Sequence, residues 1–166
     1  MLEALYIVLA YFTAFFIVAT IIKNNSIVDI GWGAGFVFVT WVTFFLSGEY
    51  NTTKLIVNIV ITLWGLRLFY YILKRNLFEK EDFRYANWRE SWGKWVIPRA
   101  FLQVFMLQGI LQFLIASPAI YLNVNSVDFH ILSLIGIVIW VIGYYFEVIG
   151  DKQLKDHIKN PDMKGK

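Results

Sequence analysis

Charged residues are confined to a few stretches of this 166-residue chain, and long apolar runs separate them. Nineteen of the 27 charged residues lie in residues 74–99 and 151–166, while 58% of the chain is hydrophobic. A soluble domain is roughly 45–50% apolar. Apolar runs of this length need a bilayer or a much larger core to cover them. The sequence therefore predicts an integral, multi-pass membrane protein whose main partner is the lipid bilayer.

Five apolar segments are long enough to cross a hydrocarbon core of about 30 Å at about 1.5 Å per residue. The predicted fold is an all-α, polytopic membrane helix bundle of about five transmembrane helices, forming a single transmembrane domain over residues 1–166. The segment that contains Asp29 and three glycines has the weakest signal of the five. The predicted helices cover residues 2–22, 27–46, 55–73, 100–122 and 129–149, with a loop over 74–99 and a tail over 150–166.

The distribution of basic residues predicts the orientation of the chain. Thirteen of the fifteen Lys and Arg residues fall on one side of the membrane if these five helices all cross it. Lys54 alone falls on the other side, and Arg67 lies within a helix. Because basic residues accumulate in cytoplasmic loops, we expect the N-terminus outside and the C-terminus in the cytoplasm. A prokaryotic inner membrane is the expected location, with the endoplasmic reticulum as the alternative.

Composition excludes several classes of site. The chain has no cysteine, so disulfides and thiolate metal sites are impossible. His130 and His157 are too few and too far apart in sequence for a histidine-based metal site, and we expect no metal. The basic residues lie next to apolar segments, which is typical of membrane topology and not of a nucleic-acid surface, so no nucleic-acid partner is expected.

Ionisable residues inside a membrane helix are costly and are candidates for function. Trp64, Arg67, Tyr71 and Arg75 recur at spacings of three and four, which places them on one helix face with Tyr70 beside it. Guanidinium groups suit phosphates because they are permanently charged and can donate two hydrogen bonds to one phosphate. The alternative is that Arg75 extends to the membrane surface and Arg67 makes a structural ion pair.

Two further groups of carboxylates are open to both readings. Asp29 opens the second helix, where the helix dipole alone favours a negative charge. Glu147 and Asp151 lie four residues apart near the end of the last helix, where the dipole disfavours them, so a polar ligand or the arginine stripe is expected to compensate. The run Asp82–Tyr85 reads as a solvated loop face. Around it, Trp and basic residues in 74–99 suggest a short helix at the headgroup level, and Pro98 is expected to mark the turn into the fourth helix.

Three sequence blocks occur together in a pattern that resembles one family. The blocks are Ser26–Asp29 with Trp32–Phe36, Leu63–Leu68 with Lys74–Asn76 and Glu81–Tyr85, and Phe146–Leu154. Their order and membrane placement are similar to the DUF1295 branch of the steroid 5-alpha-reductase-like membrane proteins. The resemblance covers most of residues 24–166.

The resemblance implies a helix bundle that binds NADPH from the cytoplasmic side and reduces a carbon–carbon double bond of a steroid or other hydrophobic small molecule. Matching positions would place Trp64, Arg67, Tyr71 and Arg75 on the cofactor-facing stripe, with Asn76 as an amide contact. It also implies cofactor contacts for Glu147, Asp151 and Lys159, and makes Asp29 the candidate acid beside the nicotinamide.

Two departures from the family pattern matter. Steroid reductases use a tyrosine as a proton donor where this chain has Trp64, so Tyr70 or Tyr71 is the candidate substitute. The family also continues with a Gly-Leu-Trp block and an Arg-His-Pro motif, whereas this chain stops at Lys166. We therefore expect a truncated family member.

Other functions stay open at this stage. A membrane methyltransferase of the isoprenylcysteine or phospholipid type would bind S-adenosylmethionine instead of NADPH. A non-catalytic membrane protein would bind neither. The sequence does not decide the substrate, the oligomeric state or the preference for NADPH over NADH.

Overall fold

The computed structural model describes residues 1–76, 80–125 and 127–159, and these ranges contain helices and no strand. This confirms the predicted all-α fold class. In chain order the elements are α1 (Leu2–Ile22), α2 (Ile27–Leu46), α3 (Thr52–Asn76), α4 (Phe83–Trp92), the 3-10 helix η1 (Gly93–Trp95), α5 (Val96–Arg99), the π-helix η2 (Ala100–Met106), α6 (Leu107–Val124) and α7 (Ile131–Lys159).

Within the described residues, five helical segments are long and apolar enough to cross a membrane. Large apolar side chains such as Ile21 and Leu114 are exposed on the outside of the helices, at 74% and 58%. Exposed apolar surface of this extent requires lipid to cover it. The chain is therefore a multi-pass membrane protein by length, composition and surface. The segments are α1, α2, α3, the run Phe83–Val124 and Ile131–His157.

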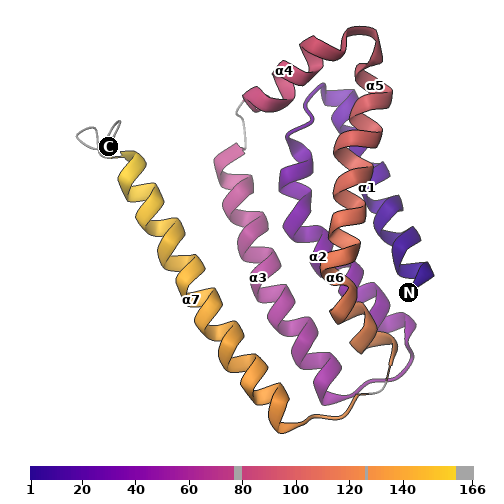
Figure 1. The fold of residues 1–166 in the computed structure, drawn as a ribbon, viewed down its shortest axis with the longest axis vertical. Coiled ribbons are helices and arrows are strands. Elements are labelled where there is room, and N and C mark those ends of the chain that lie inside the picture. Colours follow the sequence, from indigo (N-terminus) through magenta and orange to yellow (C-terminus); the bar gives the residue numbers. More distant parts are fainter. Residues whose placement is uncertain (77–79, 126, 160–166) are drawn as a thin grey trace. The chain divides into compact units, whose positions relative to one another are not determined.

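The chain divides into two compact units, Met1–Asp128 and Phe129–Lys166. In the first unit α2 is the central helix and packs against α1, α3 and α6 (Figure 1). The second unit contains α7, which continues as a helix through residues 150–159 of the predicted tail. Gln153, Leu154 and Lys155 are good helix formers, which favours this extension.

The turn before the fourth membrane segment differs from the prediction. The helical run extends back through Pro98, which lies inside α5 and not at a turn. Proline is tolerated there because the N–H groups of a first helical turn have no partner within the helix. The chain reverses instead at Gly93, which ends α4 with a φ of 48°. Glycine adopts this left-handed conformation without steric cost.

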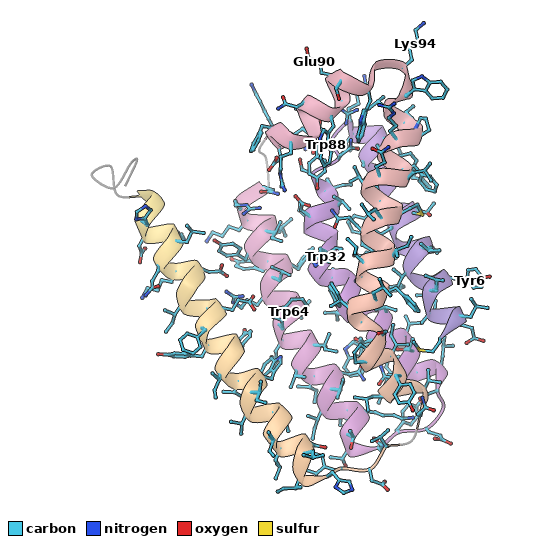
Figure 2. The ribbon with its side chains drawn as sticks, viewed as in Figure 1. Tyr6, Trp32, Trp64, Trp88, Glu90 and Lys94 are labelled. Carbon is cyan, nitrogen blue, oxygen red and sulfur yellow. The ribbon has the colours of Figure 1, made fainter. Side chains whose placement is uncertain are left out.

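Aromatic side chains fill the centre of the first unit. Phe12, Phe36 and Phe105 are buried, and the Trp32 ring meets Phe12 and Phe36 edge to face at centroid distances of 6.3 and 5.6 Å. Trp64 of α3 joins the same cluster, 5.2 Å from Phe36. Figure 2 shows Trp32 and Trp64 within the bundle. These contacts hold α1, α2 and α3 in a fixed register.

The backbones of α2 and α3 approach each other closely at two glycines. A Cβ atom added to Gly33 would lie 2.5 Å from the Gly65 carbonyl oxygen, and one added to Gly65 would lie 2.7 Å from the Gly33 oxygen. Gly31 and Gly35 of α2 leave space for side chains instead, Phe15 of α1 and Gln112 of α6.

A buried amide network joins the C-terminal parts of α2 and α6 to the N-terminal part of α3. Asn58 donates to the Asn123 Oδ1 at 2.8 Å, and Asn123 donates to the Thr40 carbonyl oxygen at 2.8 Å and to the Thr43 hydroxyl at 3.1 Å. Both asparagines are fully buried. Polar pairs of this kind bind membrane helices together because hydrocarbon offers no other partner.

Candidate functional site

The polar end of the first unit is where α2 begins and α3 ends, with α4 lying across it (Figure 1). The helix α4 begins at Asp82, whose side chain accepts a hydrogen bond from the Arg84 N–H at 3.0 Å. Such a carboxylate cap satisfies a free N–H of the first turn. Glu90 and Lys94 point away from the bundle (Figure 2).

The Asp29 carboxylate is held by two side chains of α4. The Tyr85 hydroxyl donates to one oxygen at 2.8 Å, and the Arg84 guanidinium donates to the other at 3.3 Å. Tyr85 is 4% exposed, and the Asp29 side chain is 17% exposed. Asp29 therefore has a stabilising helix-dipole position and also a specific pair of partners from a distant segment.

The turn between α1 and α2 fixes the start of α4 through two hydrogen bonds, each from a backbone N–H to a side-chain oxygen. The Asn25 N–H donates to the Glu81 carboxylate at 2.7 Å, and the Asp82 N–H donates to the Ser26 hydroxyl at 2.7 Å. Glu81 also accepts two hydrogen bonds from Arg89, at 2.8 and 2.9 Å. These contacts position α4 so that Tyr85 reaches Asp29.

The turn between α1 and α2 meets the start of α4 at a polar junction, and the charges at this junction depend on one another. Burial alone would raise the pKa of Glu81, but hydrogen bonds from Arg89 and the Asn25 N–H outweigh it and hold that pKa below its ordinary value. Hydrogen bonds from Arg84, together with its charge, likewise hold the pKa of Asp82 below its ordinary value. Both carboxylates are therefore ionised at neutral pH.

A cavity of about 280 Å³ lies beside this junction. It combines two cationic side chains, two amides, one hydroxyl, one carboxylate and the start of α2. Arg75 donates through Nε to the Asn76 Oδ1 at 3.1 Å, so these two predicted residues lie together. The described residues that line the cavity are Asn24, Ser26, Ile27, Ile30, Arg75, Asn76, Lys80 and Asp82.

Apart from the Asp82 carboxylate, which is paired with Arg84, the polar lining of the cavity suits an anion. Arginine, lysine and amide groups are the usual protein ligands of phosphate. The N-terminus of α2, a helix of 20 residues, adds a positive dipole end. The arrangement can hold a phosphate group in this cavity.

The described residues that line this cavity do not include the other predicted residues of α3. Trp64 packs on Phe36, and Tyr70 is 62% exposed. Tyr71 and Arg67 are half-buried on the same helix. Their predicted roles in cofactor binding or proton donation stay predictions.

The predicted residues of the last helix belong to the second unit. Glu147 and Asp151 are both half-buried and lie about one turn apart in α7. The Lys159 side chain lies outside the described residues. The prediction that these groups share one cofactor site with the α3 stripe stays a prediction.

Sequence reasoning missed the role of Tyr85 and its neighbours. The run Asp82–Tyr85 was expected to be a solvated loop face, but Tyr85 is buried against Asp29. Charge alone gives no signal for this contact. The presence of the run among the three family-like blocks was the available clue.

The fold and the junction define a class, a multi-pass helical membrane protein with a polar site at one end of its bundle. The family model described as "Protein of unknown function (DUF1295)" matches residues 15–166, so the chain belongs to the DUF1295 family. Comparison with curated proteins and with solved structures gave no match.

Proposed function

We propose that this chain forms all or part of a membrane-embedded, NADPH-dependent reductase of the steroid 5-alpha-reductase-like type. Its substrate would be a steroid or other lipid with a carbon–carbon double bond. The observation that carries the proposal is the cavity lined by Arg75, Asn76 and Lys80, in a member of the DUF1295 family.

The residues of the cavity fit the charged part of such a cofactor. Arg75 and Lys80 supply two cations, and Asn76 supplies an amide. A cavity of about 280 Å³ takes only one portion of the cofactor. The stripe through Arg67 and the acidic groups Glu147 and Asp151 would bind the rest, as the family resemblance implies.

When bound, NADPH supplies a hydride to one carbon of a polarised double bond. The other carbon needs a proton. Tyr85 holds a hydroxyl proton at the Asp29 carboxylate, in a setting that is largely shielded from solvent. Among the described residues, this pair is our candidate for holding and moving that proton. Tyr70 and Tyr71 are the candidates that the sequence suggests.

The experiment is a thermal-stability titration of the protein expressed from its complete gene. NADPH should raise the unfolding temperature, and Arg75→Gln or Arg67→Ala should weaken NADPH binding about ten-fold or more, the loss typical of a charged contact. Arg99→Gln is the matched control because Arg99 is exposed on α5 and does not line the cavity.

The outcomes separate the candidate functions. A shift with S-adenosylmethionine and none with NADPH would identify a methyltransferase. No shift with either would point to a non-catalytic membrane protein. Equal losses in Arg75→Gln and Arg99→Gln would remove the cavity from the proposal.

A further inference from the structure

A second cavity, of about 220 Å³, lies on the other side of the turn between α1 and α2. Successive residues of this turn alternate between the two cavities. Lys23 and Asn25 line the second cavity, whereas Asn24 and Ser26 line the first. The lining residues of the second cavity are Phe16, Thr20, Lys23, Asn25, Arg89, Val96, Ile97 and Ala100.

The second cavity has a polar end and an apolar end. Lys23, Asn25 and Arg89 supply cationic and amide groups, whereas Phe16 and Ile97 supply apolar walls. Phe16 lies inside the membrane segment of α1, about two helical turns or roughly 10 Å from Lys23. Lys23 follows the end of α1 and adopts a left-handed φ of 56°. The apolar end thus lies at greater membrane depth than the polar end.

The Asn25 side chain is buried, and its Nδ2 has no hydrogen-bond partner among the described residues. Asn25 is 3% exposed. Its backbone N–H is used by Glu81, so the side chain is not needed for that contact. A buried amide donor without a partner is destabilising. This cost would be relieved by an acceptor that enters the cavity.

We propose that this cavity binds an anionic phospholipid, with the phosphate at Lys23 and Asn25 and the start of an acyl chain along Phe16 and Ile97. Glu81 offsets the charge of Arg89, so Lys23 leaves the polar end with a net positive charge. The apolar wall favours a lipid over a soluble anion. This site is separate from the proposed reductase cavity and does not depend on it.

The test uses the complete chain in phosphatidylcholine nanodiscs to which phosphatidylglycerol is added. Thermal unfolding and native mass spectrometry report lipid binding. Asn25→Ala should unfold at the wild-type temperature or above without phosphatidylglycerol, because it removes a buried group without a partner. It should bind phosphatidylglycerol about ten-fold more weakly, the loss expected for one hydrogen bond to a charged group.

Charge variants provide the matched control. Lys23→Gln should weaken phosphatidylglycerol binding about five-fold more than Lys94→Gln, which removes the same charge from an exposed position outside the cavity. Equal losses in these two variants, or wild-type binding by Asn25→Ala, would overturn the proposal. Equal stabilisation by soluble glycerol phosphate would show a plain anion site and also overturn it.

Discussion

At the scale of single residues, the contact between Tyr85 and Asp29 ties α4 to α2. Tyr85→Phe removes the hydroxyl and leaves a largely buried carboxylate oxygen without that donor. We expect a loss of about 1–3 kcal/mol in the free energy of unfolding. Thermal or denaturant unfolding in detergent measures this loss.

Tyr6→Phe is the matched control for Tyr85→Phe. Tyr6 is 62% exposed on α1, and no hydrogen bond of its hydroxyl is described. This variant should unfold like the wild type. If both variants lose the same stability, or neither loses any, the hydroxyl of Tyr85 does not bind Asp29 in the folded protein.

The same residues show where sequence reasoning stops. Asp29 was identified because a carboxylate in an apolar segment is costly, which is a local property that a sequence displays. Tyr85 was not identified, because its position depends on contacts such as the hydrogen bond from the Asp82 N–H to the Ser26 hydroxyl, which joins residues 56 positions apart. A contact over such a separation leaves no periodic signal in one sequence.

At the scale of helices, the packing of α2 on α3 depends on Gly33. Gly33→Ala places a methyl group 2.5 Å from the Gly65 carbonyl oxygen and 2.8 Å from the Phe69 nitrogen, both backbone atoms. The helices must separate, so we expect a destabilisation of about 1–3 kcal/mol. Unfolding in detergent measures this change. Gly109→Ala should cost less, because its nearest neighbour is a side-chain atom of Phe12 at 3.2 Å.

The ends of α1 and α2 were easier to predict than the contacts between the helices. The ends of α1 and α2 agree with the predicted residues, because charge or polarity changes abruptly at Lys23, Ile27 and Ser47. The α2–α3 contact was not predicted, since three alternate glycines at 31, 33 and 35 offer different helix faces. Sequence alone does not decide which face meets backbone.

The docking of α4 should depend on pH through Glu81. Its pKa in the folded state lies below its value in the unfolded chain. Ionised Glu81 therefore stabilises the folded state above the unfolded-state pKa, which is ordinarily about 4.3. This contribution disappears as the pH falls through the folded-state pKa.

Glu81→Gln isolates this effect. Between about pH 5 and about pH 3, the unfolding temperature of the wild type should fall more steeply than that of Glu81→Gln. The variant has no charge to lose at this site. Glu90→Gln is the control, because Glu90 is exposed on α4 and points away from the bundle (Figure 2). Parallel curves for the wild type and Glu81→Gln would contradict the role of the Arg89 ion pair.

At the scale of the whole molecule, the absence of cysteine makes the orientation directly testable. Single cysteines can replace Tyr50 between α2 and α3, Lys94 after α4, Asp128 before α7 and Lys155 near the end of α7. All four positions are exposed. A membrane-impermeant maleimide then reports which side of a sealed cell or vesicle each position occupies.

The excess of basic residues on one side predicts the labelling pattern. Tyr50→Cys and Asp128→Cys should react in intact cells, whereas Lys94→Cys and Lys155→Cys should react only after permeabilisation. The result for Lys155 decides whether α7 crosses the membrane, because its apolar length permits a crossing without requiring one. Labelling of Lys94 and Lys155 on opposite sides would contradict five crossings. It would also separate Glu147 and Asp151 from the Arg75 cavity, and one shared cofactor site would then be impossible.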